Sequence, residues 1–95
     1  MVKASNGRLA FRFHARDLNL VMGPALPGGT VRFRVRIDGQ APATDGGIDV
    51  DKDGNGSLAE RRLYQLIRQK QPIVDRTFEI EFLDPGAELF VFTFG

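Results

Sequence analysis

The side chains best spaced for chemistry lie between residues 49 and 60. Asp49, Asp51 and Asp53 stand two residues apart and Glu60 follows, which matches the D-x-D-x-D-G-x5-E spacing of an EF-hand calcium loop. Carboxylate oxygens suit Ca²⁺, and the glycine at position 54 permits the sharp turn that such a loop needs. These four acidic residues are therefore candidate metal ligands, with Ca²⁺ as the candidate cofactor.

The flanking sequence argues against a true EF-hand. The eighth residue of the loop is Gly56, where an EF-hand carries an aliphatic residue, and residues 40–48 contain proline and glycines instead of an entering helix. Two other interpretations stay open. The stretch is either a calcium-binding loop between two strands, or a metal-free turn in which Asp, Asn and Gly join strands.

A second group of candidates lies in residues 31–38. Arg32, Arg34 and Arg36 occupy every second position, so in a strand they share one face and could bind an anion or an acidic sugar. Tyr64 is the only tyrosine and could stack on a ligand. The weakly favoured ligand contacts are therefore Arg32, Arg34, Arg36 and Tyr64.

The competing interpretation of the arginines is structural. Glu79 and Glu81 also alternate in sequence, so a neighbouring strand could pair them with the arginines on a solvated outer face. His14 is the only histidine, and no nucleophile stands near it at a recognised spacing. No catalytic residue is predicted.

Composition excludes several classes of function. The 95 residues include no cysteine and one histidine, which excludes thiolate catalysis, dithiol redox chemistry and cysteine-based zinc sites in this chain. Thirteen basic residues against 12 acidic ones lack the basic excess of a nucleic-acid binder. No apolar run approaches the roughly 20 residues that span a bilayer, so we expect no direct membrane insertion.

Alternation of apolar and polar residues dominates the elements that must position these candidates. It recurs in residues 8–15, 17–22, 31–38 and 77–83, and turn sequences separate the segments. Residues 88–94 are apolar on nearly both faces, which predicts a strand buried on two sides. The pattern predicts an all-β antiparallel sandwich over residues 8–95, with residues 1–7 as a tail or a truncated strand. The expected core includes Leu9, Phe11, Phe13, Leu18, Leu20, Val31, Phe33, Val35, Ile37, Phe78, Ile80, Phe82, Val91 and Phe92.

Residues 57–69 are ambiguous. Leu63, Leu66 and Ile67 stand at helical spacing, and local propensity slightly favours a helix. As a strand the segment alternates poorly. The surrounding β pattern nevertheless favours a strand, because an isolated helix must find a place on an otherwise all-β core.

Three long strings carry a resemblance to a known family: FRFHARDLNLVMGP, RLYQLIRQ and FEIEFLDPGAELFVFTFG. They resemble the C-terminal, carbohydrate-binding-module-like domain of DipZ-type thioredoxin-like proteins, which include redoxin-domain and cytochrome c biogenesis proteins. The resemblance implies a jelly-roll-like β-sandwich in which RLYQLIRQ is a strand. It also implies a fragment of a larger chain, truncated at its N-terminal strands, that works in the periplasm of the bacterial cell envelope after a thioredoxin-like domain.

We therefore expect a non-catalytic accessory module whose first partner is the thioredoxin-like domain of the same parent chain. A glycan or a protein is the expected ligand, with no nucleic acid and no resident cofactor. Two alternatives stay open. The module binds calcium through Asp49, Asp51, Asp53 and Glu60, or it is a purely structural domain that packs on its neighbour.

Overall fold

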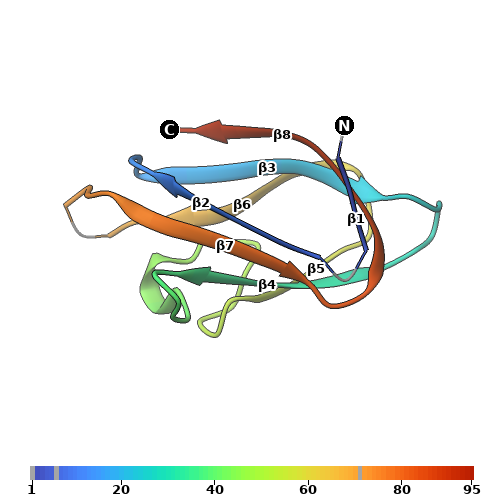
Figure 1. Ribbon diagram of the computed structural model, residues 1–95, viewed down its shortest axis with the longest axis horizontal. Helices are drawn as coiled ribbons and strands as arrows, with labels where there is room; N and C mark the ends of the chain where they lie inside the picture. The colour runs from blue at the N-terminus through green and yellow to red at the C-terminus, as the bar shows by residue number, and fades with distance from the viewer. Residues whose placement is uncertain (1, 6, 71) are drawn as a thin grey trace.

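The computed structural model describes residues 2–5, 7–70 and 72–95, and these form two antiparallel four-stranded sheets (Figure 1). The β3 sheet has the strand order β1-β8-β3-β6, and the β4 sheet has the order β2-β7-β4-β5. The strands are β1 Val2–Ser5, β2 Arg8–Phe13, β3 Asp17–Pro24, β4 Val31–Ile37, β5 Asn55–Leu58, β6 Arg62–Arg68, β7 Arg76–Phe82 and β8 Pro85–Phe94, and a 3-10 turn, η1, covers Ala43–Asp45.

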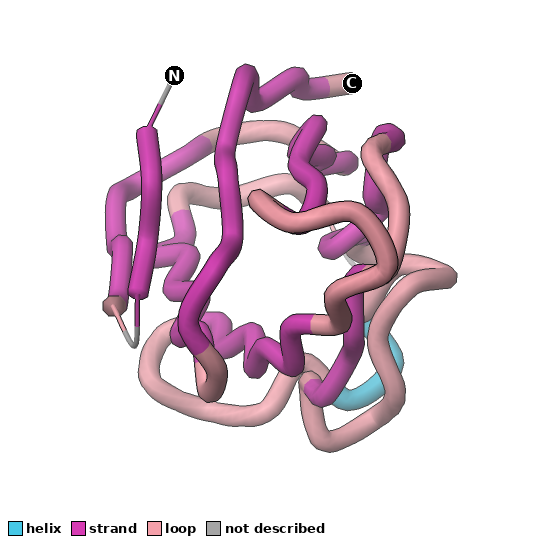
Figure 2. The backbone as a smooth tube through the Cα atoms, turned by 90° about the vertical axis from the view of Figure 1, so that its right-hand side faces the viewer, coloured by secondary structure: helices cyan, strands magenta, loops and turns pink. Residues whose placement is uncertain are grey.

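The two sheets enclose one apolar interior, and Figure 2 shows the strands arranged around it. In β4 the apolar side chains at alternate positions are buried, while the arginines between them face outward. β7 alternates in the same way, with Phe78, Ile80 and Phe82 inside. Period-two patterning therefore builds both layers, as expected for half-buried strands. The predicted all-β, jelly-roll-like sandwich is confirmed.

Most of the predicted core is buried. The structure buries Phe13, Leu18, Leu20, Val31, Phe33, Val35, Ile37, Phe78, Ile80 and Phe82. Phe11 and Phe92 are partly buried against this core. The core also contains residues that sequence analysis did not include, namely Met22, Leu58, Tyr64, Leu66, Ile67, Ala87 and Leu89.

Two predicted core residues are instead exposed. Leu9 faces inward opposite Ile80, but it lies on the edge strand β2 and stays 37% exposed. Val91 pairs with Val21 on the outer face of the β3 sheet and is 51% exposed. The prediction that residues 88–94 are buried on both sides is therefore wrong, because no described layer covers the outer face of β8.

The ambiguous segment is a strand, β6, with an irregularity that explains its poor alternation. Leu18 of β3 pairs with Ile67, whereas the next residue, Asn19, pairs with Gln65. Leu66 is thus the extra residue of a β-bulge, and both Leu66 and Ile67 are buried. Because Leu66 and Ile67 are adjacent and both point inward, the alternation of apolar and polar residues is interrupted, and the apolar positions resemble those of a helix. The local preference for a helix was wrong for that reason.

The long connection from β4 to β5 covers the free edge of β6. The backbone N–H of Gly47 donates to the carbonyl of Leu66 over 2.9 Å, and that of Asp49 donates to the carbonyl of Gln65 over 3.2 Å. A side chain at position 47 would run into the Gln65 carbonyl, so only glycine allows this close approach. The Asp-rich stretch is therefore fixed to a sheet edge rather than free in solvent.

At the amino-terminal end, residues 2–5 form the edge strand β1, and Val2 pairs with Leu89 of β8. Residues 1–7 were expected to be either a tail or a truncated strand, and residues 2–5 form a strand. Residues 1 and 6 lie outside the described part of the chain. Within that part, no helix has the length and apolar character to cross a membrane.

Candidate functional site: the arginine face

The outer face of the β4 sheet brings together the three predicted arginines. Arg34 pairs in register with Glu81 of β7, and Arg36 pairs with Glu79. Arg8 and Arg12 of β2 lie on the far side of β7, where they pair with Glu81 and Thr77. We call this surface the arginine face; its charged residues are Arg8, Arg12, Arg32, Arg34, Arg36, Glu79, Glu81 and Asp84.

Arg36 is held by two carboxylates at once. Its Nη1 donates to Oε2 of Glu79 over 2.7 Å and to Oε1 of Glu81 over 3.2 Å. Nη1 of Arg8 lies 3.6 Å from the same Glu79 oxygen. The side chains of Arg36 and Glu79 are only 26% and 19% exposed, so this network has a fixed geometry. The predicted cross-strand pairing with Glu79 and Glu81 is confirmed.

Arg32 is bound to Asp84, in the turn between β7 and β8. Its Nε and Nη2 donate to the two carboxylate oxygens over 2.9 and 2.8 Å, and its backbone N–H donates over 3.0 Å. The Arg32 guanidinium, with help from that N–H, lowers the pKa of Asp84 to about 2. Arg32 is therefore neutralised by a dedicated partner.

Arg34, between the other two, differs from both. Its Nε donates to Oδ1 of Asn55 on β5 over 3.0 Å, and it is half-buried. Among the described residues no carboxylate lies within 4 Å of it. The neutral amide of Asn55 orients the Arg34 guanidinium, and Glu81, its cross-strand neighbour, forms no ion pair with it within 4 Å.

Tyr64, the fourth predicted contact, does not belong to this surface. It is 1% exposed, its hydroxyl donates to the carbonyl of Glu60 over 2.7 Å, and its ring meets Phe33 edge-on in the core. The Arg62 guanidinium lies 3.8 Å from the ring centroid and covers its other side. The prediction that Tyr64 contacts a ligand therefore requires correction. The bulge in β6 and the packing of Phe33 turn this amphipathic side chain inward.

The Asp-rich loop uses its acidic side chains on its own backbone and on β6. Asp49 binds Nη2 of Arg62 through Oδ1 over 2.8 Å, and its Oδ2 accepts the N–H of Gln65 over 2.7 Å. Partial burial alone would raise the pKa of Asp49, but these two donors outweigh it and hold that pKa below its usual value. Oδ1 of Asp51 accepts the N–H groups of Asp53 and Asn55, each over 2.9 Å.

The structure does not gather the predicted calcium ligands. The Glu60 side chain is 75% exposed and lies 3.5 Å from Nε of Arg62. Within the described ranges, no group of three or more His, Asp or Glu side chains is placed to hold a metal ion. The turn chemistry of the metal-free interpretation is present, and calcium binding by Asp49, Asp51, Asp53 and Glu60 stays a prediction.

Among the polar pairs that sequence analysis missed is that of His14 and Asp75. Nδ1 of His14 lies 2.7 Å from Oδ1 of Asp75, with both side chains more than half exposed. These residues stand 61 positions apart and meet only because β2 pairs with β7. No local spacing could have shown the contact.

The arrangement defines a two-sheet sandwich whose polar face carries fixed guanidinium and carboxylate groups. The family model for the thioredoxin-like C-terminal domain matches residues 1–95, and the chain belongs to this family. No curated protein matches the chain significantly.

Two solved structures share the fold. One is a family two carbohydrate esterase from Clostridium thermocellum in complex with cellohexaose, with a TM-score of 0.69 and 13% identity over 96% of this chain. The other is an active-site mutant of a family two carbohydrate esterase from the same organism, with a TM-score of 0.70 and 13% identity over 98% of this chain. The chain spans about a quarter of the length of each. At this identity the likeness shows the fold alone.

Proposed function

We propose that this domain is a non-catalytic accessory module that binds acidic oligosaccharides on its arginine face. In this proposal it belongs to a DipZ-type protein of the bacterial cell envelope and positions the thioredoxin-like thiol–disulfide domain of the same chain at a glycan-bearing surface. The redox chemistry belongs to that neighbouring domain, since this chain contains no cysteine.

Arg34 carries the proposal, because its guanidinium forms no ion pair with a described carboxylate although Glu81 stands opposite it on β7. A carboxylate of a uronic acid can take the place that no protein carboxylate takes beside Arg34, while Asn55 already fixes the guanidinium plane. Fixing the plane beforehand lowers the ordering cost of binding.

The paired groups around Arg34 supply the remaining chemistry. Sugar hydroxyls both donate and accept hydrogen bonds, and the Arg36–Glu79 pair presents a donor and an acceptor 2.7 Å apart. The fold shared with part of a carbohydrate esterase solved with cellohexaose supports an oligosaccharide as the kind of ligand, whereas the preference for an acidic one rests on Arg34 alone.

Calorimetric titration with an oligogalacturonide tests the proposal, with cellohexaose as the neutral comparison. We expect binding of the acidic oligomer to weaken as salt rises. R34Q should abolish it, whereas R68Q, which changes an exposed arginine on the other sheet, should leave it unchanged. Equal affinity of the two variants for the acidic oligomer, or no heat at millimolar ligand, would refute the proposal.

A further inference from the structure

A polar groove lies at the end of the sandwich where β3 runs into the loop that leads to β4. One wall of the groove is formed by residues 24–28, and the other by the turn between β5 and β6, residues 59–61. Glu88 of β8 completes the lining. The volume of about 420 Å³ falls in the range of small-ligand sites, roughly 300–1,000 Å³. No residue of the arginine face lines this groove.

Hydrogen bonds fix both walls of the groove. On the loop side, the backbone N–H of Ala25 donates to the carbonyl of Gly86 in β8 over 2.7 Å. On the turn side, the carbonyl of Glu60 accepts the hydroxyl of the buried Tyr64 over 2.7 Å. Walls that are ordered before a ligand arrives lower the cost of binding it.

Arg61 is held across the outer face of the β3 sheet by packing. Its backbone lies directly over Gly23, where a Cβ would come within 2.8 Å of the Cα of Arg61, so only glycine permits this close approach. Its guanidinium lies 4.5 Å from the centroid of the Phe90 ring. Both ends of this long side chain therefore have a fixed support.

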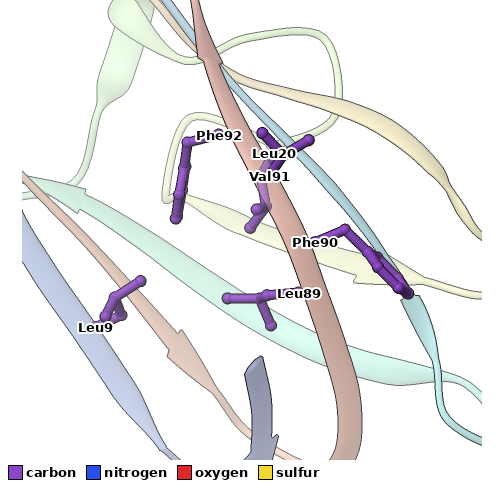
Figure 3. Close-up of a pocket in the computed structure, with 6 residues that line it drawn as sticks. All are labelled: Leu9, Leu20, Leu89, Phe90, Val91 and Phe92. Carbon is purple, nitrogen blue, oxygen red and sulfur yellow. The ribbon is translucent and has the colours of Figure 1, made fainter. Parts of the chain in front are cut away.

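A bulge in β8 places Phe90 where it can support Arg61. The register of β8 with β3 shifts after Val21, so Phe90 is an extra residue of β8. In Figure 3 Phe90 points away from Leu89, on the other side of β8. The ring thus lies on the outer face of the sheet, where it meets the guanidinium.

The groove offers a hydrogen-bond donor and hydrogen-bond acceptors together. Among the described residues, no carboxylate lies within 4 Å of the Arg61 guanidinium. The carboxylate of Glu60 is largely exposed, and Glu88 is a second acceptor. An anionic ligand would be repelled by these two carboxylates, and a cationic one by Arg61. A neutral sugar avoids both penalties, because each of its hydroxyls can donate and accept.

We propose that this groove is a second ligand site, which binds a neutral oligosaccharide. The guanidinium of Arg61 donates to neighbouring hydroxyls of one sugar ring, and the carboxylate of Glu88 accepts from another hydroxyl. Proline and alanine side chains of the walls contact the C–H groups of the ring. The groove shares no residue with the arginine face, so this site does not depend on the proposed binding of acidic oligosaccharides.

Following the backbone amides by NMR during titration with cellohexaose tests the site. We expect shifts in residues 24–28 and 59–61 and at Glu88. R61Q and E88Q should each weaken binding roughly tenfold or more, because each removes a charge-assisted hydrogen bond to the ligand. R68Q is the matched control, since Arg68 is an exposed arginine at the other end of β6. It should leave the affinity unchanged.

A59F tests the groove without changing any charge. Ala59 is exposed and lines the groove, so a phenyl ring at this position should occupy the space and abolish the shifts. Melting curves show that each variant is folded. An unchanged spectrum at millimolar cellohexaose, or shifts around Arg34 instead of in the groove, would overturn the proposal. So would equal affinities of R61Q and R68Q, or binding that A59F leaves intact.

Discussion

Asp49 and Arg62 form an ion pair that fastens the long loop to the edge of β6, with 2.8 Å between Oδ1 and Nη2. The Asp49 side chain is only 13% exposed. Its second oxygen accepts the N–H of Gln65, a backbone donor on an edge that no described strand pairs with. The carboxylate of Asp49, which the sequence spacing predicted to be a calcium ligand, therefore accepts a hydrogen bond from a backbone N–H on the edge of a sheet. This position also leaves the ring of Tyr64 beneath Arg62.

We expect D49A to lower the free energy of unfolding by about 1–3 kcal/mol, because it leaves the partly buried N–H of Gln65 and the Arg62 guanidinium without their acceptor. D53A is the matched control, since Asp53 is exposed and lies in the same loop. It should change stability by less than about 0.5 kcal/mol. Urea unfolding measures both, and equal losses would mean that Asp49 has no special structural role.

Calcium should not raise the melting temperature above the value in equal magnesium. For Asp49 to join a calcium site, its carboxylate must leave Arg62 and Gln65, which costs part of the binding energy. A tight site would instead stabilise the fold by about 2.7 kcal/mol at a hundredfold excess over its dissociation constant. A calcium-specific rise that D49A abolishes would support the calcium alternative and contradict the structural role of Asp49.

The Arg32–Asp84 pair should make stability depend on acid pH. The pKa of Asp84 in the folded protein is about 2, below its ordinary value, so folding favours the ionised carboxylate. Its contribution is fully present above the unfolded pKa of roughly 4 and is lost as the pH falls toward 2. The free energy of unfolding, measured as the pH is lowered from 4 toward 2, should fall more steeply for the unchanged chain than for D84N. Parallel curves would show that the pair adds no stability.

Gly54 should be indispensable for the turn before β5. Its φ is +87°, and a Cβ there would run into the carbonyl of Val35, whose own N–H donates to the Gly54 carbonyl over 2.7 Å. Gly28 has a similar φ of +80° but open space around it. We expect G54A to destabilise the fold clearly more than G28A. In G28A the only cost is backbone strain of roughly 1 kcal/mol, because no atom lies in the way of the new side chain. Similar melting temperatures for the two variants would exclude the clash.

Period-two patterning predicted the two layers because each strand of a sandwich repeats one rule, apolar inside and polar outside. It placed Phe33 and Ile80 in the core and Arg34 and Arg36 on the outer face correctly. It could not predict the bulge at Leu66, because a bulge depends on the register of the neighbouring strand. That one residue decided both the strand assignment and the inward position of Tyr64.

The candidate site was predictable only in part. Arginines at alternate positions must share a face of a strand, so their grouping follows from the sequence. Which arginine forms no ion pair depends on contacts across long sequence separations, such as Arg32 with Asp84 and Arg34 with Asn55. No local spacing shows these contacts. The partner of Asp49 could not be predicted for the same reason, since that partner is Arg62 on another strand.

The most direct test of the central claim is to follow the backbone amides of the domain by NMR during titration with an oligogalacturonide. The account predicts shifts concentrated on β4, β5 and β7 around Arg34, and none of comparable size on β3 or β6. Shifts confined to the β3 sheet, or an unchanged spectrum at millimolar oligosaccharide, would contradict it.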